Sequence, residues 1–348
     1  MRFLAITAMK NEGAFVLEWL AHLRVVGFSD ILVFSNDCED GSDAMLDRLQ
    51  ALGLVSHVPQ SGPFDEGPQW AALKQADRHP LRKAADWVMC LDVDEFPVIH
   101  VGDGTLGALL AALPDADAIP LTWRLFGNDG VVDFEDCPIT SRFTRAAPAV
   151  MRWPWRAQMF KTLFRGDAGY RKLGVHRPRS LLPDATPRWF DGSGRELPAT
   201  FRVKRLFSLL GQDNYRLAQL NHYPLGAMES YIVKCARGRA NRSADSLDIS
   251  YWVERNFRTT EDRSIARYDA QTRDLRRKFL ADPALAALHA QAVAWRKARF
   301  ETLMALEEYR ALFGRLMLTP ASEPLSQAQE ARMVALGARA AHGAARSG

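Results

Sequence analysis

Three acidic residues stand within four positions at the end of an apolar run. Residues 87–96 read WVMCLDVDEF, which places Asp92, Asp94 and Glu95 directly after a stretch that is typical of a buried strand. Carboxylates avoid one another and avoid apolar surroundings unless a positive group balances them. Because side chains alternate along an extended segment, Asp92 and Asp94 are expected on the same side, where their like charges repel unless a cation intervenes. Hard oxygen ligands suit Mg²⁺ or Mn²⁺, and such an ion can bridge a diphosphate and offset charge on a leaving group.

Polar residues also follow the two apolar segments nearest the N-terminus. The first segment is followed by Lys10, Asn11 and Glu12, and the second ends in Asn36 and Asp37. In an open parallel sheet, ligands bind beyond the carboxyl ends of the strands. We therefore expect these residues and the D-x-D aspartates to converge in one crevice. The simpler alternatives are that the acids are solvated loop residues, or that Asn11 and Glu12 cap the next helix, where an acid is favourable.

The elements that position these residues follow from the apolar periodicity. Strands are expected at 2–9, 30–37, 54–60 and 86–96, and helices at 13–27, 42–53 and 69–85. Ser42 is expected as the N-cap of the second helix, and Gly53 as the residue that ends it. The alternation predicts the α/β class, with a mostly parallel sheet and helices on both of its faces.

Beyond residue 96 the alternation loosens. One more helix and strand fit residues 104–126; short strands are expected at 159–165, 172–176 and 216–223, and helices at 229–242 and 283–318. The last of these helices is expected to carry one apolar stripe, formed by Trp295, Phe300, Leu303, Leu306 and Phe313. Residues 321–348 are rich in Ala, Gly and Arg and are expected to fray.

Composition bounds the function classes. The chain has 348 residues, 47% hydrophobic and 25% charged, with a formal net charge of +4, which is typical of a soluble globular protein and does not favour a nucleic-acid partner. Four scattered cysteines without a C-x-x-C pair favour reduced thiols over a disulfide framework. The first apolar run is interpreted as a strand, and no run approaches the roughly 18–20 apolar residues of a membrane span. We expect a cytoplasmic protein, with peripheral contact to the inner face of the membrane as an alternative.

A set of motifs in chain order makes the sequence similar to a known family. The motifs are AMKNEGAFVLEWLAHLRVVGFSDILVFSNDCEDGS (8–42), ADWVMCLDVDEF (85–96), WRLFGNDG (123–130), SRFTRA (141–146), FKTLFR (160–165), LGVHRP (173–178) and NHYPLGAMESYIVKCARGR (221–239). They resemble the GT-A glycosyltransferases, most closely a family-2-like group that begins with K-N-E, has a D-x-D-E-F core and is related to the family 92 enzymes. The resemblance covers roughly residues 3–240.

The resemblance implies a domain division and an activity. Residues 1–240 would form a GT-A domain, with a nucleotide-binding half at 1–100 and an acceptor-side half at 101–240, followed by a helical extension at 241–320 and a tail at 321–348. The implied activity is metal-dependent hexosyl transfer, inverting, from a nucleotide sugar of the UDP type to a saccharide or glycolipid acceptor in bacterial surface polysaccharide assembly.

The resemblance also implies roles on the donor side. Asn11 and Glu12 would lie near the base or ribose, and Asp37 would accept hydrogen bonds from the uracil or ribose. Gln69 would touch the nucleotide, as would its neighbour Trp70 unless that ring only packs.

The implied metal and diphosphate contacts come from several segments. Asp94 would bind Mn²⁺ or Mg²⁺ directly, and Asp92 would reach the metal through water or bind the ribose. His222, or else His176, would add a metal ligand. The last role falls on two cations, Lys234 and Arg237, which would neutralise the diphosphate.

The catalytic base is expected on the acceptor side. An inverting transferase requires a carboxylate to deprotonate the attacking hydroxyl. Asp129 in WRLFGNDG is the first choice, followed by Asp133 and then by Glu135 and Asp136.

Other functions remain open at this point. A non-catalytic nucleotide- or glycan-binding module would keep the same acids. A haloacid-dehalogenase-type phosphatase also has a D-x-D after an apolar strand, but there it normally follows the first strand. A basic set in the C-terminal helices would either contact anionic lipid or, as we favour, form the outer face of a packed helix: Arg276, Arg277, Lys278, Arg296, Lys297 and Arg299.

Overall fold

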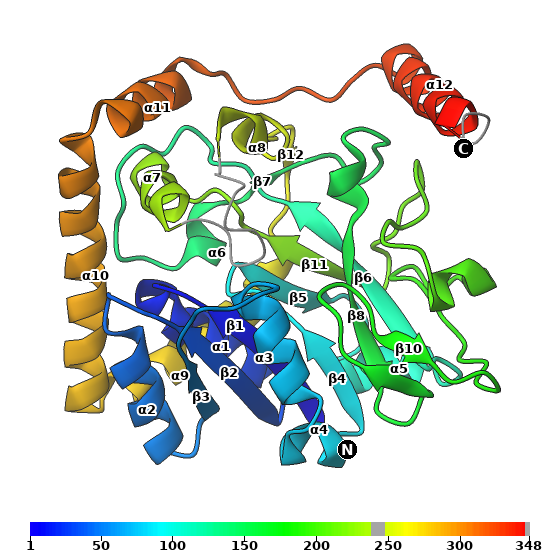
Figure 1. Cartoon of the computed structure of the whole chain (residues 1–348), viewed down its shortest axis with the longest axis horizontal. Helices are drawn as coiled ribbons and strands as arrows, with labels where there is room; N and C mark the ends of the chain where they lie inside the picture. The colour runs from blue at the N-terminus through cyan, green and yellow to red at the C-terminus, as the bar shows by residue number, and fades with distance from the viewer. Residues whose placement is uncertain (238–247, 345–348) are drawn as a thin grey trace.

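One eight-stranded sheet organises the protein. The computed structural model describes residues 1–237 and 248–344. The strands lie in the order β3 (Ser56–Gln60), β2 (Asp30–Asn36), β1 (Phe3–Met9), β4 (Trp87–Cys90), β8 (Phe160–Arg165), β6 (Ala118–Leu125), β11 (Ala218–His222) and β5 (Glu95–Ile99). The first four are parallel, as are β6 and β11, whereas β8 and β5 run in the opposite direction (Figure 1). The predicted mostly parallel α/β sheet is confirmed.

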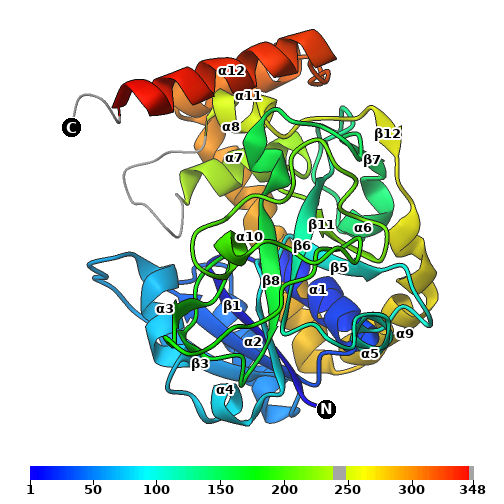
Figure 2. The ribbon, with the colours of Figure 1, turned by 90° about the vertical axis from the view of Figure 1, so that its right-hand side faces the viewer.

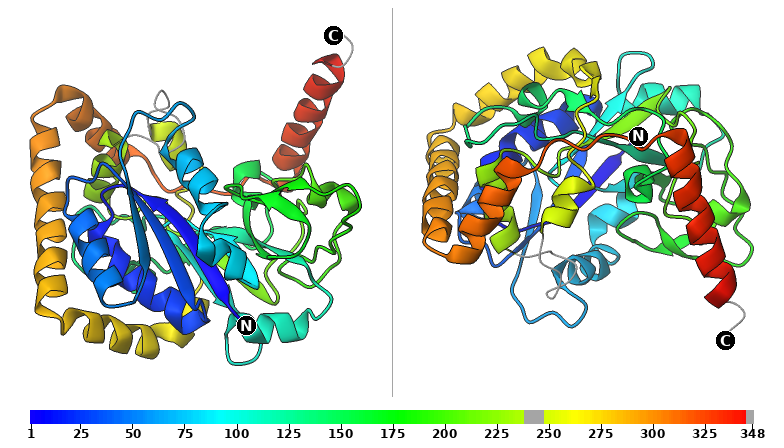
Figure 3. Two further views of the ribbon diagram at one scale, coloured as in Figure 1. Left: turned by 60° about the horizontal axis from the view of Figure 1, so that its bottom comes forward. Right: turned by 90° about the horizontal axis from the view of Figure 1, so that it is seen from above.

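Both faces of the sheet are covered because its strands are apolar on both sides. In β1, Phe3 and Ala5 belong to one core cluster, whereas Leu4 and Ile6 belong to another. The first cluster includes residues of α1 (Gly13–Val26), α2 (Ser42–Ala51) and α5 (Leu106–Ala112), and the second includes residues of α3 (Pro68–Ala76). The buried alternation therefore fixes helices on opposite faces (Figure 3).

The predicted strand 86–96 is wrong in its second half. Strand β4 ends at Cys90, and Glu95 already begins β5, which pairs with β11 at the far edge of the sheet. Asp92 and Asp94 therefore lie in the link between two strands. The backbone of this link is fixed by hydrogen bonds, among them the Tyr223 N–H to the Asp94 carbonyl at 2.9 Å.

Two other predictions in the first half need correction. Residues 69–85 form two helices, α3 and α4 (Pro80–Ala84), because Pro80 lacks an N–H and His79 before it is extended. The N-cap of α2 is Gly41, not Ser42, whereas Gly53 follows the helix with a φ of 70°, as expected of the residue that ends it.

The second half contains short elements joined by long loops. These elements are α6 (Ile139–Arg142), β7 (Arg145–Ala146), η1 (Trp155–Gln158), β9 (Tyr170–Lys172), β10 (Arg179–Leu181) and η2 (Ala199–Arg202). The strands expected at 159–165 and 216–223 are present as β8 and β11. The strand expected at 172–176 is wrong, because β9 ends at Lys172 and His176 lies in a loop.

Helices dominate the C-terminal part. They are α7 (Met228–Ala236), α8 (Ile249–Val253), η3 (Ser264–Tyr268), α9 (Asp269–Leu280), α10 (Pro283–Met304), α11 (Glu307–Leu318) and α12 (Gln327–Ala344), with the short strand β12 (Thr260–Glu261) pairing β7. Figure 2 shows α12 lying across one end of the molecule, and Figure 1 shows that α11 and α12 stand at opposite sides of that end, joined by an extended segment. The expected helix 229–242 extends beyond the described residues after Arg237.

The long C-terminal helix is divided. Residues 283–318 form α10 and α11 with a break at Ala305 and Leu306, and the Leu306 side chain is exposed, so its place in the apolar stripe is wrong. Residues 327–344 are helical in α12, where fraying was expected. Within residues 1–237 and 248–344, no helix combines the length and apolar character needed to cross a bilayer.

Candidate active site

A cavity of about 470 Å³ opens at the carboxyl ends of β1, β2 and β4. This volume is in the range of small-molecule sites. Most of the predicted site residues line it: Glu12, Asp37, Gln69, Asp92, Asp94, His176, His222, Lys234 and Arg237. The strand ends, the β4–β5 link, β11 and α7 therefore converge as expected.

Asp92 is neutralised by a buried lysine from β8. Lys161 Nζ lies 2.9 Å from Asp92 Oδ2 and 3.4 Å from Glu95 Oε2, and its side chain is 1% exposed. Burial alone would lower the pKa of Lys161, but the two carboxylates outweigh burial and raise it. The amine is therefore a fixed positive charge under the D-x-D link.

Glu95 faces the core rather than the cavity. Its Oε1 accepts a hydrogen bond from Trp123 Nε1 at 2.7 Å, and its Oε2 accepts the Asp92 N–H at 2.9 Å. Burial raises the pKa of Glu95 to about 8, with Lys161 acting against that rise. Glu95 thus orients the link and the Trp123 ring, which lines the cavity.

Asp94 is neutralised by a second lysine, from α7. Lys234 Nζ lies 2.7 Å from Asp94 Oδ2 and donates to the Pro224 carbonyl at 2.8 Å. Burial would raise the pKa of Asp94, but Lys234 and His222 outweigh burial and hold it well below its usual range. His222 Nε2 lies 3.7 Å from Asp94 Oδ1, and burial lowers the pKa of His222, which favours its neutral ring.

The predicted metal centre, Asp94 and Asp92 with either His222 or His176, is not preformed. Among the residues that the structure describes, no group of three or more His, Cys, Asp and Glu side chains is arranged to hold a metal ion. His176 Nδ1 bonds to the Phe160 carbonyl at 2.9 Å. Asp94 and a neutral His222 are the two side chains with suitable donors at suitable proximity, and a Mg²⁺-type ion in such sites is commonly held by one or two protein ligands plus phosphate oxygens. Of the predicted metal ligands, only Asp94 and His222 are therefore placed to bind one metal ion together.

The turn after β1 is held by arginines instead of acting as a helix cap. Glu12 occupies the N-cap position of α1 without a side-chain capping bond, and its Oε1 lies 2.5 Å from Arg237 Nη1. Asn11 has a φ of 54° and accepts the Glu39 N–H on its Oδ1 at 2.7 Å. Asn11 is buried and is not among the residues lining the cavity, so the structure brings Glu12, but not Asn11, to the site.

The β2 end and α3 complete the donor side. Asp37 lies in the left-handed region with a φ of 44°, is exposed and lines the cavity, as does its buried neighbour Asn36, whose Oδ1 has no protein partner. Gln69 Nε2 donates to Asp92 Oδ1 at 3.2 Å. The Trp70 ring instead stacks with the Arg179 guanidinium at 4.3 Å and does not line the cavity.

The predicted bases lie elsewhere. Asp129 and Asp133 are exposed on the loop after β6, and neither lines the cavity. Glu135 pairs with Arg142 at 2.9 Å, and Asp136 lies 3.0 Å from His289 Nε2. The structure therefore does not bring these carboxylates to the D-x-D link.

Sequence reasoning undervalued several cavity residues. Lys161 was detectable, because a single cation inside the apolar strand FKTLFR must find a counter-charge. Trp123, Arg156 and Arg255 also line the cavity. Trp123 opens the motif WRLFGNDG, but the local sequence does not distinguish Arg156 or Arg255 from the other arginines of the chain.

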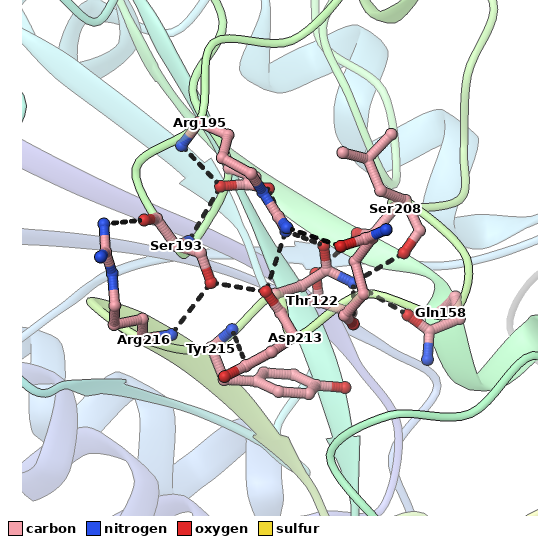
Figure 4. Close-up of polar contacts among 12 residues, drawn as sticks. Thr122, Gln158, Ser193, Arg195, Ser208, Asp213, Tyr215 and Arg216 are labelled. Atoms are coloured by element: carbon pink, nitrogen blue, oxygen red, sulfur yellow. Dashed lines mark hydrogen bonds and ion pairs between the residues drawn. The ribbon is translucent and has the colours of Figure 1, made fainter.

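A hydrogen-bond network fixes the wall that carries Arg156. Gln158 ends η1 and is fully buried; its carbonyl accepts the Ser208 N–H at 2.8 Å, and its Oε1 accepts Asn214 Nδ2 at 3.2 Å. The Ser208 hydroxyl also bonds to Thr122 on β6 at 2.6 Å (Figure 4). The wall is therefore tied to the sheet through side chains.

The sheet order and the acidic link at its carboxyl edge define an α/β protein with a mostly parallel sheet and a ligand-sized cavity at that edge. Similar solved structures include TarS of S. aureus, with 13% identity, a TM-score of 0.33 and coverage of 54% of this chain and 36% of that one. Another is glucosyl-3-phosphoglycerate synthase from Mycobacterium tuberculosis in complex with Mn²⁺, UDP and glucosyl-3-phosphoglycerate, with 13% identity, a TM-score of 0.27 and coverage of 48% and 58%.

The sequence comparison gives the family. A glycosyltransferase family 92 protein from Ricinus communis is 28% identical over 93 residues, which are 26% of this chain and 16% of that protein, so the chain spans a minor part of the length of this relative. The sequence model of glycosyltransferase family 92 matches residues 7–193, more than half of the 348-residue chain. The protein therefore belongs to glycosyltransferase family 92, and the haloacid-dehalogenase alternative is wrong.

Proposed function

We propose that the protein transfers a glycosyl group from a nucleotide sugar, with a UDP-sugar as the donor and inversion at the anomeric carbon. The observation that carries the proposal is the convergence of Asp94, Lys234 and Arg237 in one cavity at the carboxyl edge of the sheet. This is the edge at which α/β sheets bind ligands. Family 92 membership supports the reaction class.

The donor diphosphate would lie against α7. Lys234 and Arg237 both line the cavity, and each is paired with one carboxylate, Asp94 and Glu12 respectively. A diphosphate carries more charge than the two cations have free, so a divalent ion would complete the balance. The nucleoside would lie towards Asn36 and Asp37, which line the same cavity.

A Mn²⁺ or Mg²⁺ ion would be held by Asp94 and His222, with Asp92 and His176 further away in the proposed set. Such an ion supplies Lewis-acid stabilisation of a diphosphate leaving group. The protein's own contribution is to keep His222 neutral by burial and to keep Asp94 ionised beside Lys234.

The acceptor would approach from the wall formed by Trp123, Met159 and Arg156. An aromatic ring and an aliphatic side chain at this wall suit the face of a sugar. We assign the acceptor as a saccharide or glycolipid of bacterial surface polysaccharide, and peripheral membrane contact of the basic C-terminal helices stays the less favoured alternative to an outer face of packed helices.

A thermal-shift panel tests the donor assignment. The native protein is heated with UDP, GDP or their sugars, with and without Mn²⁺, because a ligand that binds only the folded state must raise the Tm. We expect UDP and UDP-sugars to raise the Tm in a metal-dependent way, and Asp94→Asn to abolish this rise. Asp133→Asn, an exposed carboxylate outside the cavity, is the matched control and should respond like wild type.

The outcomes separate the parts of the proposal. Stabilisation by GDP compounds instead would contradict the UDP assignment, and stabilisation by UDP without Mn²⁺ would contradict the requirement for a divalent ion. A binding module without turnover would bind UDP-sugar but would not hydrolyse it when acceptor is withheld, so slow Mn²⁺-dependent release of UDP distinguishes the transferase from that alternative.

A further inference from the structure

A buried arginine from α10 contacts the turn after β1. Arg296 is 4% exposed, and its Nη2 donates to the Asn11 carbonyl at 2.9 Å. The same nitrogen lies 3.7 Å from Glu12 Oε2. A guanidinium presents several donors in a rigid plane, so one side chain can hold both a carbonyl and a carboxylate. Arg296 was expected in an exposed basic set, and that prediction is wrong because the side chain is buried.

The same guanidinium also reaches α7. Arg296 Nη1 donates to Ser230 Oγ at 2.9 Å, one turn before Lys234 on that helix. Arg237, at the end of α7, donates to the Lys10 carbonyl and pairs with Glu12. Two arginines therefore join the Lys10–Glu12 turn to the helix that carries the proposed diphosphate cations.

The turn needs such support because of its backbone. Asn11 has a φ of 54°, in the left-handed region, which asparagine adopts more readily than most residues but which is uncommon without contacts that fix it. Its carbonyl is directed to Arg296, and its side chain accepts the Glu39 N–H from the loop after β2. A turn held in this conformation places Glu12 in the cavity and connects the ends of β1 and β2.

Helix α10 lies close to both of these strand ends. A Cβ on Gly13 would stand 2.7 Å from Ala292 Cβ, so only glycine permits this approach. Gln291 lies against Gly41 in the loop after β2. Because Ala292 and Arg296 are four residues apart, they share one face of the helix. Figure 1 shows α10 beside α2 and α7 along the nucleotide-binding half.

From these contacts we infer that α10, which lies outside the matched family region, completes the donor site, and that Arg296 is a positioning residue for Glu12 and Lys234. Arg296 acts through the turn and through α7, and it does not itself need to touch the reacting atoms. The inference rests on the proposed function only for what the turn binds, a nucleoside diphosphate.

The test compares two buried residues of α10 in the full-length protein. Arg296→Met removes the guanidinium, and Arg296→Lys keeps the positive charge but not the planar group with several donors. Phe300→Leu loosens the packing of the same helix four residues further on and does not contact the Lys10–Glu12 turn. Hydrogen exchange of peptides covering residues 10–13 and 39–42 reports the turn, and titration with UDP and Mn²⁺ reports the site. Tm values of all variants show the general loss of stability.

We expect Arg296→Met to accelerate exchange in both peptides and to raise the Kd for UDP by about tenfold, the size expected when one charge-assisted hydrogen bond that orders a site is lost. Arg296→Lys should lie between Met and wild type, and Phe300→Leu should change neither readout, whatever its Tm. Unchanged exchange in Arg296→Met, or the same changes in Phe300→Leu, would overturn the positioning role.

The two proposals fail in different ways. If wild type binds no UDP, the donor assignment is wrong, while the exchange comparison still decides whether Arg296 positions the turn. If exchange accelerates but the UDP affinity stays at its wild-type value, the turn does not serve the nucleotide, and the inference is overturned although the donor assignment stands.

Discussion

The two sides of the cavity are built in different ways. The nucleotide side, the part within residues 1–90 that we propose binds the donor, is built on the parallel strands β1 to β4, whose backbone ladders and apolar side chains fix the strand ends. The acceptor side, residues 127–225 in our proposal, adds only β8 and β11 to the main sheet; its other elements are short, and its loops are held by side-chain hydrogen bonds such as those around Gln158 and Ser208 (Figure 4). A ladder tolerates the loss of one side chain better than a network does, because its hydrogen bonds are made by the backbone. Substitutions should therefore act differently on the two sides.

The largest effect is expected where the two sides meet. Lys161→Met leaves the Asp92 and Glu95 carboxylates near each other without their cation, and breaking a buried ion pair on one side typically costs about 3–5 kcal/mol. Urea unfolding measures this loss. The double variant Lys161→Met/Glu95→Gln should recover part of the stability at pH 9, because above its pKa of about 8 the buried Glu95 carboxyl must ionise without its cation or be held protonated, whereas the amide does neither; a double variant no more stable than the single one at that pH would contradict the pairing.

A smaller effect tests the nucleotide side, which is built on strand ladders. His22 in α1 is buried, and its Nε2 donates to the Pro97 carbonyl at 2.8 Å. Burial lowers the pKa of His22 to about 4, below the value near 6.5 of an unfolded chain. Between these values the unfolded state binds more protons, so His22 adds stability above pH 6.5 that is lost as the pH falls towards 4, in total roughly 3 kcal/mol.

His22→Gln isolates that contribution. The amide can still donate to the Pro97 carbonyl but does not titrate, so unfolding free energies measured between pH 7 and pH 4 should fall less steeply than in wild type. The carboxylates titrate in both proteins and cancel in the comparison. Equal slopes would show that His22 is not the group responsible.

These contrasts also explain how much the sequence predicts. Apolar alternation in β1 and β2 located the sheet and the strand ends, because both follow from neighbours in the chain. The sequence placed Asp92 and Asp94 correctly in the cavity but not their partners. Lys161 and Lys234 lie 69 and 140 residues away from them, and no local pattern encodes such a pairing.

The acceptor side could not be predicted from the sequence for a related reason. The pattern LGVH was expected to be a strand ending at His176, yet the segment has no strand partner after Lys172, and Thr162 Oγ1 binds the His176 carbonyl at 2.8 Å. Its conformation depends on side chains from distant segments. Arg296 is the same case: its charge suggested an exposed face, and only the packing of α10 shows that it is buried.

A more modest loss of stability tests the side-chain hydrogen bonds around Ser208. Ser208→Ala leaves the Thr122 hydroxyl buried without its partner, which typically costs about 1–3 kcal/mol. The double variant Thr122→Val/Ser208→Ala removes both hydroxyls and should cost less than the sum of the single variants, as measured by urea unfolding. UDP affinity should be unchanged in all three, because the network supports the wall and not the strand ends. A weakened UDP affinity would show that the two sides are not independent.

The smallest effect concerns the residues first expected to act as bases. Removing a general base costs a transferase about 10²- to 10⁴-fold in kcat. Asp129 and Asp133 are exposed and outside the cavity, so Asp129→Asn and Asp133→Asn should each keep glycosyl transfer within about twofold of wild type. A hundredfold loss in either variant, with unchanged UDP affinity and Tm, would mean that the loop after β6 moves to the cavity during the reaction. The acceptor side would then differ from the nucleotide side in mobility as well as in construction, since the strand ends already line the cavity.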